Sequence, residues 1–193
     1  MESIIKKYEV MLKGNTPVVW DRMKKEIEDE KKKLKKDQLS EYEEKNWINK
    51  AETNNGNAIV PPEWIKSMLI NACKQTRLIP HYATKKNESY TRYMQGVLLQ
   101  MKNPIIVCKK DNLEQLGGYY PSQPQKLNSG KIWKVFPYKK EWNIKFELVD
   151  PFGRMKKDEL QELLEYGGMF IGIGSQRTMN YGRFDVESVK EIK

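Results

Sequence analysis

The chain has 193 residues, of which 38% are hydrophobic and 32% charged, with a formal net charge of +9 and a pI of about 9.3. This size and apolar content allow one domain, or one domain with an insertion. No segment approaches the roughly 20 apolar residues of a membrane span, and the first residues lack the apolar core of a signal peptide. We therefore expect a cytoplasmic protein without a membrane partner, whose positive charge favours a polyanion.

The N-terminal part begins with a strand predicted at residues 8–13, followed by a short extended segment. Residues 21–37 read as one exposed helix with Asp21 as its N-cap. Lysines alternate with acids along this segment, a pattern typical of a solvated helix with many ion pairs. Residues 40–60 are polar and include a turn or loop at 53–57.

A second helix is predicted to begin at Pro61-Pro62, since proline favours the first helical turn. Its apolar residues recur at helical spacing, which predicts a core helix; they are Trp64, Ile65, Met68, Leu69, Ala72 and Cys73. The two cysteines, Cys73 and Cys108, form neither a disulfide framework nor a metal-ligand set. We expect both to be small core residues, and we expect no metal site and no cofactor.

The remaining pattern contains strands, loops and one more helix. A helix at 156–166 is predicted to end at Gly167-Gly168 as a C-cap, and a turn-rich segment at 117–130 is predicted to project as a loop or hairpin tip. Strands are expected at 97–99, 105–109, 132–137, 142–149 and 183–189. This order fits an α+β fold, an RNA-recognition-like (ferredoxin-like) antiparallel sheet with helices on one face. We expect a single domain with a charged helical insertion at about 21–57 and a loop or hairpin insertion at about 114–131.

A glycine-rich segment near the C-terminus, residues 172–185, carries the strongest functional signal. Its notable residues are Gly172, Gly174, Arg177, Tyr181, Gly182 and Arg183. Glycine allows positive φ or a close approach, and arginine offers a planar set of donors for phosphate and for stacking on bases. The segment is not a Walker loop, and its glycines do not lie between a strand and a helix as in dinucleotide-binding folds. It predicts a polyanion-binding surface; the alternative is an ordinary loop anchored by an ion pair of Arg183 with Glu162 or Glu165.

A second basic region lies in the middle of the chain, where residues 51–110 hold nine Lys or Arg residues against three acids. We expect nucleic-acid contacts here from Lys66, Arg77, Lys85, Lys86 and Arg92. Sequence-tolerant binding of a single strand needs such cations together with aromatic faces for the bases. Tyrosines in expected loops or element ends supply those faces, with ordinary packing as the alternative for each; they are Tyr82, Tyr90, Tyr93, Tyr119, Tyr120 and Tyr181.

Three segments together resemble the repeat-associated (RAMP) superfamily, whose best-known members bind guide RNA in CRISPR effector complexes. The first is residues 8–22. The second is residues 59–72, where the matches to the motif before the family's first core helix are Val60-Pro61 and Ile65-Lys66. The third is the glycine-rich segment, where the matches to the family's terminal pattern are Gly172, Gly174, Gly182 and Arg183. Pro62-Glu63 replaces a Gly-Ser pair of the family. The chain is also similar to stand-alone, backbone-subunit-like proteins of phage and mobile-element genomes.

The resemblance implies an RNA-recognition-like fold and non-catalytic binding of single-stranded RNA or DNA, with Arg22 among the contacts. Self-association along a strand and contact with CRISPR effector subunits follow as partner hypotheses. One alternative is a decoy or replacement subunit that acts on an effector complex. Another is a metal-independent RNA endonuclease with His81, the single histidine, as general acid or base. Asp21 and Asp150 lie near strand ends, but nothing in the sequence marks either as a metal ligand.

Overall fold

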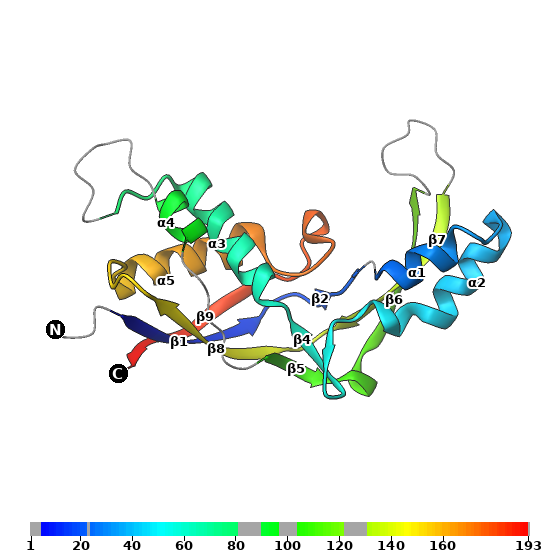
Figure 1. Ribbon diagram of the computed structural model, residues 1–193, viewed down its shortest axis with the longest axis horizontal. Coiled ribbons are helices and arrows are strands. Elements are labelled where there is room, and N and C mark those ends of the chain that lie inside the picture. Colours follow the sequence, from blue (N-terminus) through cyan, green and yellow to red (C-terminus); the bar gives the residue numbers. More distant parts are fainter. Residues whose placement is uncertain (1–4, 23, 81–89, 97–103, 122–130, 193) are drawn as a thin grey trace.

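The computed structural model describes residues 5–22, 24–80, 90–96, 104–121 and 131–192. These residues form an elongated molecule in which β1 begins and β9 ends at the same end of the long axis (Figure 1). The described part contains three antiparallel sheets of three strands each, together with helices. No helix within these ranges is long and apolar enough to cross a membrane.

The central sheet is built on β1 (Lys6–Gly14), which pairs antiparallel with β8 (Asn143–Asp150) on one side and β9 (Phe184–Ile192) on the other. A further strand, β5 (Ile105–Lys109), lies beside β8. β5 belongs to another of the three sheets, so the order β9-β1-β8-β5 is one of position and not of continuous hydrogen bonding; it matches the order of a split βαβ unit. It confirms the α+β fold with an antiparallel sheet that the sequence predicts.

Helices α3 (Pro62–Thr76) and α5 (Lys157–Tyr166) cover one face of this sheet, and α4 (Tyr90–Gly96) packs on α3 (Figure 1). Strand alternation turns every second side chain of β1 toward the helices. The apolar stripe of α3 meets these side chains and is fully buried at Ile65, Met68, Leu69, Ala72 and Cys73. The predicted core helix is confirmed, except that Trp64 of its stripe is only half-buried.

The opposite face of the central sheet is open and polar. Its side chains carry both charge signs, and Lys145 of β8 binds Glu9 of β1 at 2.8 Å. No aromatic side chain lies on this face within the described strands. Because RNA-recognition folds that bind RNA on the sheet use aromatic side chains there, this face lacks the stacking platform of such folds.

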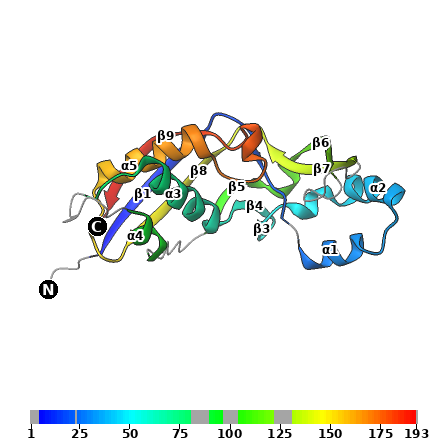
Figure 2. The same cartoon turned by 90° about the horizontal axis from the view of Figure 1, so that it is seen from above.

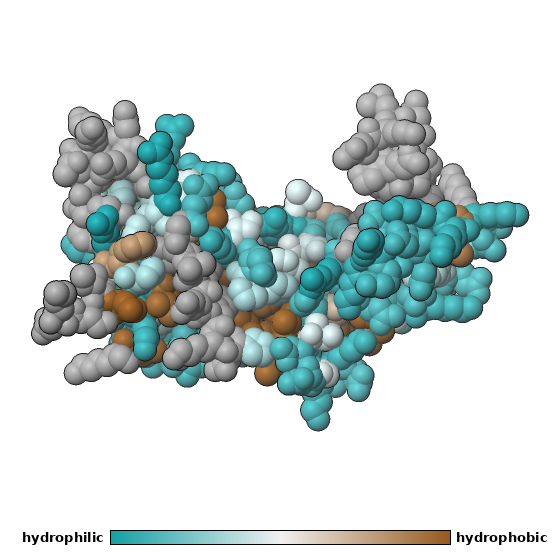
Figure 3. Space-filling view, viewed as in Figure 1, coloured by the Kyte–Doolittle hydropathy of each residue, from teal (hydrophilic) through white to brown (hydrophobic). Residues whose placement is uncertain are grey.

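A second group of elements extends the molecule at the end opposite α4 and α5 (Figure 2). It contains α1 (Lys25–Lys31), α2 (Lys36–Asn46) and the short 3-10 helix η1 (Trp47–Lys50). α2 and η1 pack on β7 (Lys131–Lys139), which forms a hairpin with β6 (Glu114–Pro121). The surface over α1 and α2 is hydrophilic (Figure 3).

Charged side chains hold this group together from the inside. Glu43 and Lys50 are each 2% exposed and form an ion pair, and Lys31 binds the other carboxylate oxygen of Glu43. The Lys50 ammonium also donates to the Val135 carbonyl at 2.6 Å and lies 4.6 Å from the centroid of the Phe136 ring. Buried charges persist in folded proteins when they are paired, so this network ties α1 and α2 to β7.

The prediction of one helix over residues 21–37 is wrong. The N-cap of α1 is Lys24, not Asp21, and residues 32–35 separate α1 from α2. α2 extends to Asn46, into a part of the expected helical insertion that the sequence pattern describes only as polar. Its buried anchor, Glu43, is charged, so no apolar period reveals the helix.

Two segments with strong turn signals contain strands. β3 (Thr53–Asn54) and β4 (Asn57–Val60) form a hairpin around Asn55 and Gly56, whose φ angles are 47° and 77°, as expected of an Asn-Gly turn. Gly117 lies inside β6, where an added Cβ would overlap an indole ring of β7. Glycine in a strand often marks such a close approach, so the segment predicted as a loop or hairpin tip begins inside β6, a strand of the β6–β7 hairpin.

Candidate nucleic-acid interface

The helix α5, which leads toward the glycine-rich loop, ends at Tyr166 with Gly167 as its C-cap, as the sequence predicts. Gly167 has a φ of −58°, and residues Gly167–Ile171 continue α5 as one π turn (η3). A Cβ on Gly167 would overlap the Met68 sulfur, and a Cβ on Gly168 would overlap the Phe184 carbonyl oxygen. The two glycines therefore permit the close packing of this turn on α3 and β9, and Gly167 caps α5 with a right-handed backbone. The π turn ends at Gly172, whose φ is 74°.

The glycine-rich loop, residues 172–183, folds as a tight turn with several left-handed residues. Gly172, Gly174 and Gly182 have φ angles of 74°, 85° and 72°, which glycine adopts without steric cost. A Cβ on Gly182 would overlap the Ile173 carbonyl oxygen, and a Cβ on Gly174 would lie 2.8 Å from a backbone oxygen of β2 (Val18–Val19). These glycines shape the loop, as the sequence predicts.

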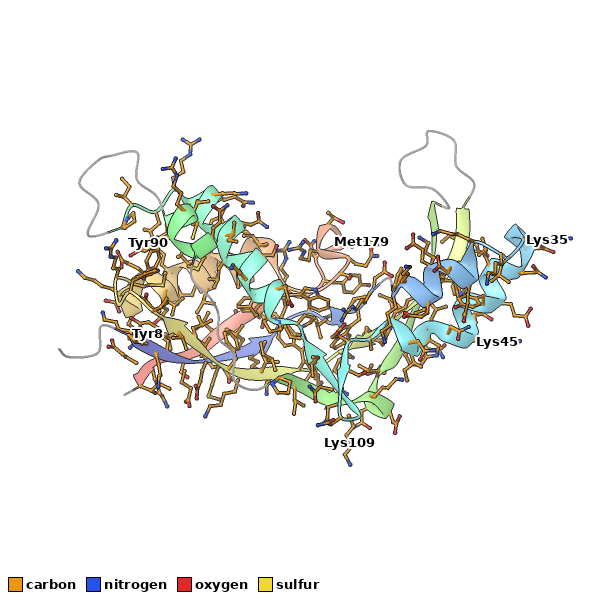
Figure 4. The ribbon with its side chains drawn as sticks, in the orientation of Figure 1. Tyr8, Lys35, Lys45, Tyr90, Lys109 and Met179 are labelled. Atoms are coloured by element: carbon orange, nitrogen blue, oxygen red, sulfur yellow. The ribbon has the colours of Figure 1, made fainter. Side chains whose placement is uncertain are left out.

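Backbone hydrogen bonds tie this loop to the segment between β1 and β2. The amide of Gly182 donates to the Pro17 carbonyl at 2.8 Å, and the amide of Ser175 donates to the Val19 carbonyl at 2.8 Å. The Thr16 hydroxyl donates to the Asn180 carbonyl at 2.8 Å. The loop is therefore a fixed scaffold for its side chains. In Figure 1 it rises beside the N-terminal half of α3, and Figure 4 labels Met179 within it.

Arg177 and Arg183 lie together in the loop, and no acidic side chain in the described part of the chain forms a salt bridge with either of them. The Arg183 Nη2 atom makes long contacts with the Arg177 carbonyl at 3.5 Å and the Asn180 Oδ1 atom at 3.4 Å. Its Nη1 atom is covered from solvent and has no hydrogen-bond partner in the described part of the chain. Burial, and then the charge of Arg177, lower the pKa of the Arg183 guanidinium. The alternative anchor is not formed, since no salt bridge joins Arg183 to Glu162 or Glu165.

A groove runs from this loop along the first turns of α3. Its inner hollow, about 460 Å³ in volume, is lined by α3 and the loop, with Trp64, Ser67, Gln176, Arg177 and Thr178 among its residues. Its outer hollow, about 520 Å³, lies at the start of α3. Asp21, Trp64 and Ser175 line both hollows, so the two are adjacent. Arg177 is the arginine that lines the inner hollow, and Arg183 lies behind it.

Trp64 is held in place from behind. Its ring centroid is 6.3 Å from that of the buried Trp20, whose Nε1 atom donates to the Ile59 carbonyl at 2.8 Å. A half-buried indole in a groove offers a π face to a ligand. The sequence pattern assigns Trp64 only to the core.

The outer hollow is acidic. It contains Asp21, Glu52 and Glu63 against one arginine, Arg22, which already forms a salt bridge with Glu52. Burial raises the pKa of the Asp21 carboxyl above its usual range, although three nearby lysines oppose this effect. A phosphate is therefore favoured at the Arg177 side of the groove and disfavoured at its outer end.

The structure divides the predicted contact residues into separate groups. Tyr181 lies in the loop with the two arginines and is half-buried. Lys66 follows Trp64 by two positions, so it faces another side of α3. Arg77 and Arg92 are exposed near the other end of α3, and 13 residues of helix place Arg77 about 20 Å from Trp64. Lys85, Lys86 and His81 lie outside the described residues.

Two of the six tyrosines considered for stacking on bases have structural roles. Tyr90 is fully buried and its hydroxyl donates to Glu159. The Tyr93 hydroxyl donates to Asp150, whose carboxylate also accepts the amides of Phe152, Gly153 and Met155. These two tyrosines belong to the packing of α4, so the prediction that they present stacking faces is wrong. Tyr119 is 71% exposed, and Tyr82 lies outside the described residues.

The chain matches no protein-family model and no curated protein sequence. Among solved structures, the chain is similar to a chain of the type III-B Cmr-beta complex bound to cognate target RNA, with a TM-score of 0.49 and 9% sequence identity. The match covers 98% of this chain and 61% of the chain of that complex. It is also similar to Cmr6 from Pyrococcus furiosus, with a TM-score of 0.47 and 11% identity over 97% of this chain and 100% of that one. With TM-scores below 0.5, neither likeness says what this chain binds.

Proposed function

We propose that this protein binds single-stranded nucleic acid in the groove between the glycine-rich loop and α3, as a stand-alone RAMP-type protein of the kind found in phage and mobile-element genomes. The observation that carries the proposal is the position of Arg177, which lines the groove beside the half-buried indole of Trp64. The sequence resemblance of the glycine-rich segment supports the same assignment.

The electrostatics of the loop favour an anion. Arg177 and Arg183 lie side by side, and no salt bridge in the described part of the chain neutralises either one. Two adjacent cations raise the local potential, and a phosphate oxygen accepts strong charge-assisted hydrogen bonds from a guanidinium. Binding of a phosphate at Arg177 relieves the repulsion between the two side chains.

The aromatic side chain selects a single strand over a duplex. Unstacked bases of a single strand stack on aromatic rings, whereas the bases of a duplex are covered by their neighbours. Trp64 lies beside Arg177 in the same hollow, so one nucleotide can contact both. RNA and DNA single strands share this chemistry.

The test is a fluorescence-anisotropy titration of the full chain with an unstructured 12-nucleotide strand and with the matching duplex, over a range of salt concentrations. We expect the single strand to bind more tightly, with the logarithm of the dissociation constant linear in the logarithm of salt concentration. Binding of neither strand at low salt would contradict the proposal, as would equal affinity for the duplex.

A second candidate function, favoured by a separate observation, is contact with a protein. Met169 and Phe170 of the π turn are 68% and 57% exposed, and the Phe170 ring lies 4.8 Å from that of Tyr166. Exposed apolar side chains at adjacent positions are typical of interaction surfaces. A decoy or replacement subunit should recover CRISPR effector subunits in a pull-down after nuclease treatment, and Met169→Ser with Phe170→Ser should abolish that recovery.

A further inference from the structure

Asp21 lies where the two hollows of the groove meet, and its carboxylate makes no hydrogen bond in the described part of the chain. Two of the three lysines near it are engaged elsewhere, and the third is Lys134 of β7. Lys50 binds Glu43 and the Val135 carbonyl, and Lys31 binds Glu43 as well. A half-buried carboxylate in a cleft, to which no protein group donates, is a candidate for a functional site.

The surroundings of Asp21 supply a stacking surface, and no side chain in the described part of the chain donates a hydrogen bond to its carboxylate. Trp64 shares both hollows with Asp21 and is backed by Trp20. Ser67 lies one helical turn beyond Trp64 and lines the same hollow. The indole, the carboxylate and the Arg177 guanidinium therefore surround one space of about 460 Å³, within the usual size of ligand pockets of about 300–1,000 Å³.

We propose that the inner hollow takes a guanine base of a bound single strand, stacked on Trp64, with its N1–H and exocyclic amino group donating to the Asp21 carboxylate. This inference rests on the proposed function and names the nucleotide that the same groove prefers. The phosphate of that nucleotide lies toward Arg177, because Glu63 and the Arg22–Glu52 pair make the outer hollow unfavourable for it.

The preference for guanine follows from the hydrogen-bond donors that each base presents. An ionised carboxylate has two acceptor oxygens and no donor. Guanine presents two adjacent donors on its Watson–Crick edge, and a single strand exposes that edge. Adenine and cytosine each place a ring acceptor beside their amino group, and uracil flanks its one N–H with two carbonyl oxygens. In these three bases an acceptor atom would lie against a carboxylate oxygen and be repelled by it. Guanine is therefore the base that donates a hydrogen bond to each of the two oxygens.

The experiment compares labelled nine-residue oligouridine strands that carry uracil, guanine, inosine, adenine or cytosine at the central position. We expect the guanine strand to bind about tenfold more tightly than the all-uridine strand, as a bidentate base contact gives. Inosine keeps the N1–H but lacks the amino group, so its strand should lie between the two. Asp21→Asn should bring the guanine and uridine strands to within twofold of each other. Glu147→Gln, on the open sheet face, is the matched control and should retain the preference.

The outcomes separate this inference from the proposed function. Equal affinity for all five strands, or a preference for adenine or cytosine, would overturn the guanine assignment while the proposed function stands. A guanine preference that survives Asp21→Asn would overturn the role of Asp21. If no strand binds at low salt, both proposals fail. Circular dichroism melts of Asp21→Asn establish that the variant is folded before it is titrated.

Discussion

The Arg183 amide donates a 2.8 Å hydrogen bond to the hydroxyl of Thr16, which joins the end of the glycine-rich loop to the segment after β1. The same hydroxyl donates to the Asn180 carbonyl at 2.8 Å. Residues 167 positions apart in the sequence thus fix the loop that carries Arg177. The binding surface depends on this tie as much as on its charged side chains.

Thr16→Val should loosen the loop without changing charge. The variant removes two hydrogen bonds, and we expect the free energy of unfolding to fall by about 1–3 kcal/mol, measured by urea denaturation. Affinity for a single strand should fall as well, because Arg177 is no longer held at the groove. Thr53→Val, at an exposed position of β3, is the control. Unchanged stability and affinity of Thr16→Val would show that the tie is dispensable.

Gly182→Ala and Gly56→Ala should differ although both glycines have positive φ, 72° and 77°. A Cβ at Gly56 meets nothing within 4 Å, whereas a Cβ at Gly182 overlaps the Ile173 carbonyl oxygen. Gly56→Ala should cost about 1–2 kcal/mol of stability for the left-handed backbone alone, and Gly182→Ala should cost clearly more. Thermal melts of the two variants make the comparison. Equal costs would mean that the loop adjusts around the added methyl group.

Glu43→Gln should destabilise the end of the molecule formed by α1, α2 and β7. Removing one partner of a buried ion pair costs about 3–5 kcal/mol, and Lys50 is 2% exposed. Glu41→Gln is a matched control, since Glu41 forms an exposed pair with Lys45 on the same helix at 2.6 Å and should show no measurable change. Hydrogen exchange of β7 amides locates the effect. Similar behaviour of the two variants would contradict a structural role for the buried network.

Asp21→Asn should stabilise the protein at neutral pH. Burial raises the pKa of Asp21 in the folded state, so the folded state binds more protons than the unfolded state between the ordinary pKa of about 3.9 and the raised value. Stability contributed through Asp21 therefore falls as pH rises through this window. The difference in melting temperature between Asp21→Asn and the parent should grow from pH 3 to pH 7. A difference that shrinks over this range would mean that Asp21 is stabilised as a carboxylate.

Apolar periodicity predicts the parts of the fold that apolar side chains build. The stripe of α3 and the strands β1, β5, β7 and β8 follow their patterns closely. Elements held by charge or by backbone proximity do not show such a pattern. α2 is anchored by Glu43, and the π turn that follows α5 depends on close contacts at Gly167 and Gly168. The expected division into one domain with insertions at 21–57 and 114–131 stays a prediction.

The sequence predicts only the part of the candidate site that lies within one continuous segment. The glycine-rich loop and Arg177 can be read from residues 172–183 alone. The groove needs Asp21, Trp64 and Arg177, which come together because the loop hydrogen-bonds to Pro17 and Val19 and α3 packs beside it. Contacts between segments that are distant in the sequence produce no pattern within any one of those segments. The clustering of tyrosines and cations in the sequence also predicts a binding surface around Tyr90 and Tyr93. In the structure, the hydroxyl groups of these tyrosines bind Glu159 and Asp150 instead.

The most direct measurement is the salt dependence of single-strand binding by the parent, Arg177→Ala, Arg183→Ala and the control Lys13→Ala. Lys13 is exposed on β1, away from the groove. Arg177→Ala should cost about 1–3 kcal/mol of binding free energy and lower the salt slope by about one ion, with an unchanged melting temperature. Arg183→Ala should weaken binding less, because it only lowers the positive potential around Arg177. Lys13→Ala should bind like the parent. If Arg177→Ala binds like the parent while Arg183→Ala unfolds the protein, the loop is structural and the proposed interface is wrong.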